Sequence, residues 1–174
     1  MISWFQQANI LLKHNLLIIF PRYIYQHYTI HLHCLFSRHR YLQHTFPNSI
    51  FPACTFNVGP NAVTFEHVDN GNFAGGLCPI TCGGAFDSKL GSHLILFNWK
   101  VFIEFPSAST IIIPSSLLGH RNTPIQPGEH HVSFTQYCAR GLIWWVQHGF
   151  QSIKACTLND PQLRERLESL PPGK

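Results

Sequence analysis

The chain has 174 residues, of which 45% are apolar and only 11% are charged. This length suits one domain with a single core, and there are enough apolar residues to fill it. The formal net charge of +4 lies within residues 1–50, because residues 51–174 hold equal numbers of basic and acidic side chains. A basic N-terminal strip could meet nucleic-acid phosphates, although a weakly selected N-terminus explains it as well.

The cysteines and the apolar runs bear on the cellular compartment. A chain of this length and apolar content does not need its six cysteines as a disulfide framework, so we expect free thiols in a reducing compartment. The apolar run 10–20 is broken by Lys13 and Asn15 and is shorter than the ~20 residues of a membrane span. We therefore expect no membrane span and an intracellular location, the nucleus included.

Residues 1–50 are rich in histidine and aromatic side chains. A helix is predicted over residues 2–19, and Pro21 would end it. The stretch 23–42 has no clean period, so no element is predicted there. His31, His33 and Cys34 are metal-binding residue types, but no second cluster completes a site, which favours scattered surface histidines.

From residue 51 to about residue 149, short apolar runs alternate with Gly, Pro and Asn. This pattern is typical of an all-β domain. Strands are predicted over residues 54–58, 62–67, 78–82, 93–97, 101–105, 110–114 and 131–137. Many short strands at regular spacing indicate a sandwich or a barrel. No helix of ten residues fits between them, which argues against a parallel α/β sheet.

The C-terminal part follows the last predicted strand. Residues 141–149 fit either a final strand or a short helix. Asp160 and Pro161 then open a charged helix that runs to about Leu170, with the acid at the cap and the proline in the first turn.

One short motif carries chemistry. His67 and Asp69 stand two residues apart at the end of a predicted strand, so their side chains point to the same face of an extended segment. One imidazole and one carboxylate can then reach a common ion, and a second histidine would complete a facial triad for Fe(II). His120, 51 residues after Asp69, is the candidate third ligand, since that gap accommodates the intervening strands. The plain alternative is that both histidines are ordinary polar residues at strand ends.

An ordered set of segments carries a family resemblance over roughly residues 51–152. These segments are Thr55-Phe56-Asn57, Gly59-Pro60, His67-Val68-Asp69, Gly71-Asn72, Phe86-Asp87, His93-Leu94-Ile95-Leu96, Phe105-Pro106, Ser109-Thr110-Ile111, His120, Asn122 and Ser133-Phe134-Thr135-Gln136. Together they resemble fungal proteins of the 2-oxoglutarate/Fe(II) oxygenase superfamily that are related to the TET and J-binding-protein DNA-base oxygenases.

The resemblance implies a mainly β fold, a double-stranded β-helix or jelly-roll, with flanking helices at both ends. It implies an atypical segment over residues 1–50, an oxygenase-like domain over 51–152 and a helical tail over 153–174. It also implies Fe(II) and 2-oxoglutarate as cofactors, with His67, Asp69 and His120 as the iron ligands.

Family members carry a basic residue after the distal histidine, commonly Arg, which pairs with the far carboxylate of 2-oxoglutarate. In this chain the matching position is His131, which is shorter than Arg and only partly charged near pH 7. Ser133 is expected to donate to the same carboxylate, and Asn57 is a further candidate that fits a turn role equally well.

Two functions follow from these observations. The first is a 2-oxoglutarate/Fe(II)-dependent dioxygenase that uses O₂ and acts on a nucleobase methyl group, with DNA as the weakly supported partner. The second is a jelly-roll that binds a metal or a ligand but is catalytically impaired because it lacks the cosubstrate arginine. A structural remnant of a fragmentary gene is the third reading.

Overall fold

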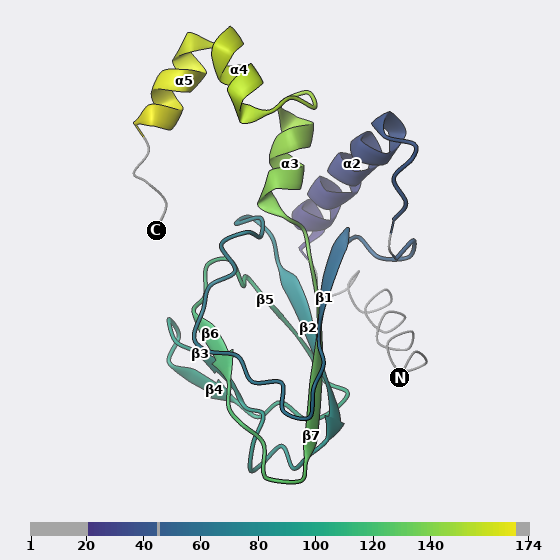
Figure 1. The fold of residues 1–174 in the computed structure, drawn as a ribbon, viewed down its shortest axis with the longest axis vertical. Helices are drawn as coiled ribbons and strands as arrows, with labels where there is room; N and C mark the ends of the chain where they lie inside the picture. The colour runs from purple at the N-terminus through teal and green to yellow at the C-terminus, as the bar shows by residue number, and fades with distance from the viewer. Residues whose placement is uncertain (1–20, 45, 170–174) are drawn as a thin grey trace.

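The computed structural model describes residues 21–44 and 46–169, and its ribbon is drawn in Figure 1. Its helices are α2 (Arg22–Arg38), α3 (Arg140–Gln147), α4 (Ile153–Asn159) and α5 (Pro161–Glu168). Its strands are β1 (Ala53–Asn57), β2 (Cys78–Ala85), β3 (Leu94–Leu96), β4 (Val101–Ile103), β5 (Thr110–Ile113), β6 (His120–Asn122) and β7 (His130–Tyr137).

The strands form two antiparallel sheets. The larger sheet has the order β1-β7-β2-β5 and the smaller has the order β4-β3-β6. An apolar cluster lies between them, with buried members from both sheets and from their loops: Cys82, Leu94, Leu96, Phe105, Ile113 and Leu118. This arrangement confirms the predicted mainly β jelly-roll, and no helix interrupts the chain between β1 and β7.

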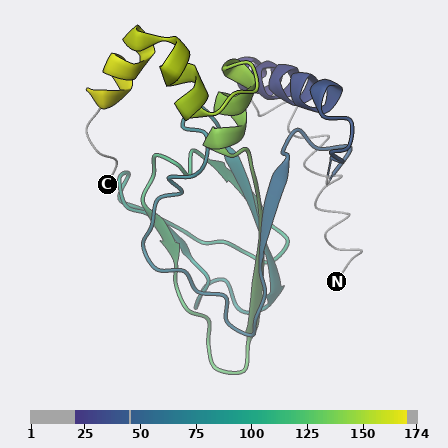
Figure 2. The ribbon, with the colours of Figure 1, turned by 45° about the horizontal axis from the view of Figure 1, so that its top comes forward.

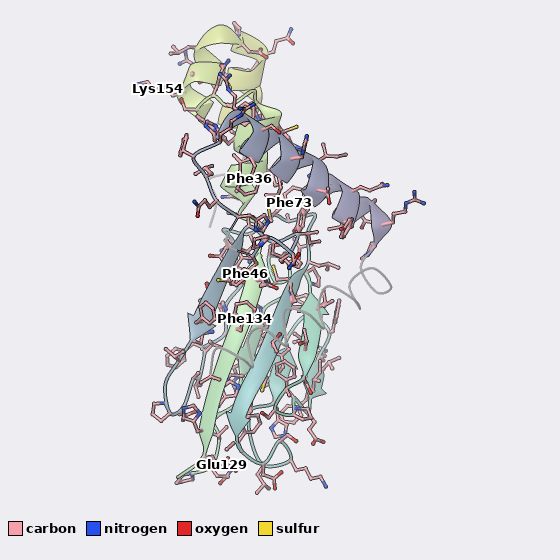
Figure 3. The ribbon with its side chains drawn as sticks, turned by 90° about the vertical axis from the view of Figure 1, so that its right-hand side faces the viewer. Phe36, Phe46, Phe73, Glu129, Phe134 and Lys154 are labelled. Carbon is pink, nitrogen blue, oxygen red and sulfur yellow. The ribbon has the colours of Figure 1, made fainter. Side chains whose placement is uncertain are left out.

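The side chains of strand β7 lie on both faces of the larger sheet. Its side chains alternate, so Ser133 and Thr135 line an interior cavity, whereas Phe134 lies on the other face. There the Phe134 ring contacts the rings of Phe46 and Phe56, and Figure 3 shows Phe46 beside Phe134. The odd-numbered residues of this strand are therefore the ones available for binding.

The helices gather at one end of the sheets, where Figure 2 shows them above the strands. A second buried cluster joins α2 and α3 to this end through Ile24, Tyr28, Phe51, Cys138 and Ile143. The division at residues 50 and 152 stays a prediction, because no observation tests it.

Helix α2 contradicts the prediction that stretch 23–42 has no element. Its buried residues are Ile24, Tyr28, Leu32 and Leu35, which recur at the spacing of one helix face. Exposed apolar residues on the opposite face, such as Tyr23 and Ile30, hide that stripe in the sequence. The helix predicted over residues 2–19 lies outside the described residues.

Two predictions about strands were wrong. Residues 62–67 form no ladder and make only an isolated bridge at His67, and the strand β6 was not predicted at all. The side chain of Asn122 in β6 supplies hydrogen-bond partners to the backbone of this segment. Its Oδ1 accepts from the Thr64 amide at 2.7 Å, and its Nδ2 donates to the Ala62 carbonyl at 2.7 Å.

The helices at the C-terminal end lie closer to their predicted positions. Residues 141–149, left open between strand and helix, contain most of α3. Helix α5 begins at Pro161 as predicted, and the Gln162 amide donates to Oδ1 of Asp160 at 3.0 Å. Helix α4 lies within the helical tail predicted over residues 153–174; its N-cap is Ser152, whose hydroxyl accepts from the Ala155 amide at 3.2 Å.

All six cysteines are free thiols, in agreement with the sequence prediction. Within the described part of the chain, no helix has the length and apolarity needed to cross a membrane.

Candidate metal centre

Two chain segments that are distant in sequence bring the predicted ligands together. His67 and Asp69 lie between β1 and β2, and His120 is the first residue of β6. His67 and His120 form an isolated antiparallel bridge, in which each amide donates to the other residue's carbonyl at 3.1 and 2.9 Å. The Asp69 amide donates to the Ser115 carbonyl at 3.0 Å, which anchors the next part of the segment.

Both imidazoles are oriented by the same kind of hydrogen bond. Nδ1 of His67 lies 2.8 Å from the Phe65 carbonyl oxygen, and Nδ1 of His120 lies 2.8 Å from the Leu118 carbonyl oxygen. A carbonyl only accepts, so each Nδ1 carries the proton and donates. Each Nε2 is then left with a lone pair, which is the form of histidine that binds a metal.

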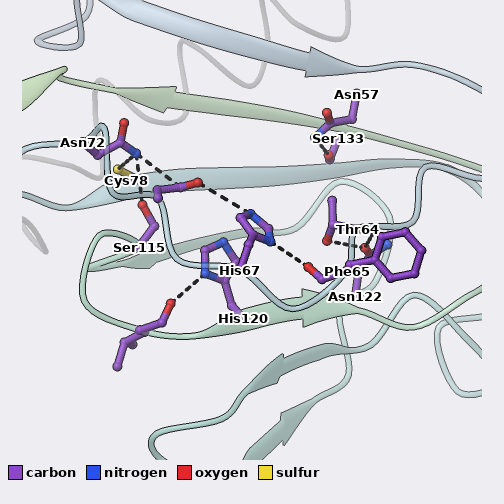
Figure 4. Close-up of polar contacts among 12 residues, drawn as sticks. Asn57, Thr64, Phe65, His67, Asn72, Cys78, Ser115, His120, Asn122 and Ser133 are labelled. Carbon is purple, nitrogen blue, oxygen red and sulfur yellow. Dashed lines mark hydrogen bonds and ion pairs between the residues drawn. The ribbon is translucent and has the colours of Figure 1, made fainter. Parts of the chain in front are cut away.

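The three ligand atoms converge. One atom from each of His67, Asp69 and His120 lies within 4.8 Å of the other two, and Nε2 of His67 is 3.5 Å from Oδ1 of Asp69. Figure 4 shows the side chains of His67 and His120 next to each other. Two imidazole nitrogens and one carboxylate are the donor set of a non-haem Fe(II) centre with open positions, so the residues present fit this metal.

The rest of the described chain offers no competing site of this kind. Among residues 21–44 and 46–169, the group formed by His67, Asp69 and His120 is the one set of three such side chains close enough to share an ion. His31, His33 and Cys34, considered in the sequence, do not form such a group.

The triad opens into a cavity of about 510 Å³ between the sheets. His120 is buried at 5% exposure, whereas the side chains of His67 and Asp69 are 41% and 28% exposed. The cavity has the size of a small-molecule site. Its lining residues are Thr55, Asn57, Thr64, His67, Asp69, Gly71, Asn72, Ile80, Leu94, Phe105, His120, Asn122, His131, Ser133, Thr135, Tyr137 and Ala139.

The three residues predicted to bind the cosubstrate all line this cavity. Asn57 and Ser133 are partners on neighbouring strands, and Nδ2 of Asn57 donates to Oγ of Ser133 at 3.0 Å. The Ser133 hydroxyl can therefore direct its own proton toward a ligand. Asn57 has this partner on β7 rather than a purely local turn role.

His131 is buried at 3% exposure, with its ring edge-on to that of Phe86. Its Nδ1 lies 3.1 Å from the carbonyl oxygen of Ala62. Burial lowers the pKa of His131, and the neighbouring His130 lowers it further, against the opposing effect of the hydrogen bond to Ala62. The imidazole is therefore neutral near pH 7.

Among the described residues, no lysine or arginine lines the cavity. Arg121 is exposed and its guanidinium lies 5.8 Å from the centre of the Phe97 ring. Arg140 is exposed at the start of α3. Neither arginine replaces the cation that is missing at His131.

Sequence reasoning missed the residues that support Asp69. Nδ2 of Asn72 lies 3.2 Å from Oδ2 of Asp69, 3.2 Å from Oγ of Ser115 and 3.4 Å from Sγ of Cys78. The Asp-Asn-Gly-Asn turn was visible in the sequence, but nothing in it shows that the second asparagine turns back onto the carboxylate.

Comparison with known proteins gives a likeness of fold. No family model and no curated protein matches the chain. Among solved structures it is similar to NgTET1 in complex with 5mC DNA, with a TM-score of 0.57 and 15% identity over 78% of this chain. It is also similar to the viral collagen prolyl hydroxylase vCPH from Paramecium Bursaria Chlorella virus-1 in its 2OG complex, with a TM-score of 0.33 and 13% identity over 59% of this chain and 69% of that one.

The likeness to NgTET1 is one of fold, the jelly-roll. The chain covers 48% of NgTET1, so it spans about half the length of that protein. At this level of identity the likeness shows the jelly-roll alone.

Proposed function

We propose that this chain is a 2-oxoglutarate/Fe(II)-dependent dioxygenase-like protein in which His67, Asp69 and His120 hold the ferrous ion. The observation that carries the proposal is the convergence of one imidazole nitrogen from each histidine and one carboxylate oxygen beside a cavity. In enzymes of this fold, the bound iron with 2-oxoglutarate and O₂ supplies the oxidant that hydroxylates a C–H bond, with succinate and CO₂ as coproducts.

Backbone and side-chain groups of the protein have defined tasks in this proposal. The carbonyls of Phe65 and Leu118 hold the two imidazoles in the metal-binding tautomer. Ser133, fixed by Asn57, donates its hydroxyl proton to the far carboxylate of the cosubstrate. His131 lines the same cavity, but its neutral ring has one N–H, which donates to the Ala62 carbonyl, so none is left for a carboxylate.

Metal titration tests the centre directly. We expect the full chain to bind one Fe(II) under anaerobic conditions, and His67→Ala or His120→Ala to abolish measurable binding, because two protein ligands hold the ion poorly. His130→Ala is the matched control, since His130 is an exposed histidine outside the cavity lining. Equal binding by the wild type and His67→Ala would refute the centre.

The proposed substrate is a methyl group on a nucleobase, and the proposed kinship is with the TET and J-binding-protein oxygenases, including their fungal relatives. The support is the jelly-roll shared with NgTET1, whose structure contains 5mC DNA. Such a substrate would place the protein in the nucleus. Mass spectrometry of an oligonucleotide containing 5-methylcytosine, after incubation with Fe(II), 2-oxoglutarate and O₂, tests this step; an unchanged oligonucleotide alongside succinate release would point to another substrate.

A second candidate function is favoured by one observation. Because the described cavity wall has no lysine or arginine and His131 is neutral near pH 7, the cavity lacks a cation for a dicarboxylate. The alternative is thus a jelly-roll that binds metal or another ligand without turnover. Fe(II) binding without succinate release would select this alternative over the dioxygenase.

A further inference from the structure

The two oxygens of Asp69 have different surroundings. Oδ1 faces the metal centre, 3.5 Å from Nε2 of His67. Oδ2 accepts a hydrogen bond from Nδ2 of Asn72 at 3.2 Å. A carboxylate can bind a metal through one oxygen or through both. In this site one oxygen is already held by the protein.

Asn72 is itself firmly held. Its side chain is buried at 8% exposure, and Nδ2 also reaches Oγ of Ser115 at 3.2 Å and Sγ of Cys78 at 3.4 Å. Its amide donates to the Asp69 carbonyl at 2.9 Å, and it forms an isolated bridge with Ala139. Figure 4 shows Asn72, Cys78 and Ser115 grouped together to the left of His67 and His120.

Ser115 ties this group to the backbone of the ligand segment. Its side chain is completely buried, and its carbonyl accepts from the Asp69 amide at 3.0 Å. The main chain and the side chain of Asp69 are therefore fixed by the same neighbours. A carboxylate held at both points has little freedom to rotate about its χ angles.

We propose that Asn72 is a positioning residue of the metal centre, which holds Oδ2 of Asp69 and makes this carboxylate a one-oxygen ligand. The inference rests on the proposed function, because it assumes that the triad binds a metal. Its consequence is that one coordination position stays available that a two-oxygen carboxylate would fill. The buried polar cluster around Asn72 thus acts on the geometry of the centre as well as on the packing of the loop.

Titration of the full chain with Co(II) tests this role, since the visible spectrum of Co(II) reports the number and arrangement of its ligands. We expect Asn72→Ala to weaken Co(II) binding by about 10- to 100-fold, the usual cost of losing an outer partner of a ligand. We also expect its spectrum to change, because the freed carboxylate can bind through both oxygens. Asn70→Ala, an exposed asparagine in the same turn, should leave affinity and spectrum unchanged.

A second variant keeps the test decisive if Asn72→Ala does not fold. Asn72→Ser retains a hydroxyl donor on a shorter side chain, so it should bind Co(II) with an affinity between those of the wild type and Asn72→Ala. A wild-type spectrum and affinity in Asn72→Ala would overturn the positioning role while leaving the metal centre intact. Absence of Co(II) binding by the wild type and by Asn70→Ala would overturn the metal centre itself, and the positioning role with it.

Discussion

In the proposed function, His131 stands where the resembled oxygenases carry a basic residue for the cosubstrate. It stands at the start of β7 and lines the cavity, yet its Nδ1 donates to the Ala62 carbonyl and burial lowers its pKa. A neutral imidazole has one N–H, and because Ala62 accepts it, none is left for a carboxylate. An arginine would give a permanent charge and a planar pair of donors.

We therefore expect His131→Arg to tighten 2-oxoglutarate binding to the metal-loaded chain. A hydrogen bond to a charged group contributes about 1.5–3 kcal/mol, which corresponds to about a 10- to 100-fold gain in affinity. Isothermal titration calorimetry measures it. His130→Arg, which adds the same charge at an exposed position, should have a much smaller effect; equal gains in both variants would mean that general charge, not the cavity, binds the cosubstrate.

At the residue scale, the sequence predicts which side chains form the site better than it predicts how those side chains are oriented. The H-x-D spacing and the distance to His120 selected three side chains that the fold brings together. The tautomers of the two histidines depend on the carbonyls of Phe65 and Leu118. The orientation of the Asp69 carboxylate depends on Asn72. These partners are set by backbone geometry and by contacts across the fold, which residue types and spacing do not encode.

The segment between β1 and β2 is the element that links fold and site. It carries His67 and Asp69, and it lies beside β6 without forming a ladder. Asn122 supplies the missing hydrogen bonds through its side chain: to Ala62, to the Thr64 amide, and to Oγ1 of Thr64 at 2.9 Å. The position of His67 thus depends on an asparagine on the strand of the other histidine ligand.

Asn122→Ala should therefore affect both stability and metal binding. Removing the side chain leaves the Thr64 amide and the Ala62 carbonyl without these partners, at a cost of about 1–3 kcal/mol in the free energy of unfolding. Urea unfolding of the metal-free chain measures that cost, and Fe(II) titration measures the weaker binding. Asn61→Ala, an exposed asparagine of the same segment, is the control; a metal affinity unchanged by Asn122→Ala would show that His67 is placed by other contacts.

The elements also show where periodicity fails as a guide. Strand β7, which pairs on both sides within its sheet, largely alternates buried and less buried positions, and its predicted bounds of 131–137 are close to the observed ones. Helix α2 was missed because its exposed face is also apolar. The segment 62–67 was predicted as a strand from its sequence pattern, but the side chain of Asn122, rather than a neighbouring strand, hydrogen-bonds the backbone of Ala62 and Thr64.

At the scale of the whole molecule, histidine is the main titratable group near neutral pH, with twelve copies in the chain. Folding lowers the pKa of three histidines in the described part of the chain. Burial lowers the pKa of His27, His44 and His131; the charge of His31 adds to the effect at His27. Nε2 of His27 and Nε2 of His44 are buried with no hydrogen-bond partner among the described residues. Nδ1 of His44 accepts from the Phe46 amide at 3.1 Å, so adding a proton to this ring would break that hydrogen bond.

This arrangement predicts that the metal-free chain loses stability as the pH falls. In the unfolded chain these histidines have the ordinary pKa of 6.5, and in the folded chain the pKa is lower, so between the two the unfolded state binds more protons. The free energy of unfolding then rises with pH, is full above about 6.5 and declines below it. Urea midpoints from pH 8 to 5.5 should fall accordingly in the wild type. The midpoints should fall less in the triple variant His27→Gln, His44→Gln, His131→Gln, since glutamine does not titrate. Equal falls of the urea midpoint with pH in the two proteins would show that other groups govern the acid sensitivity.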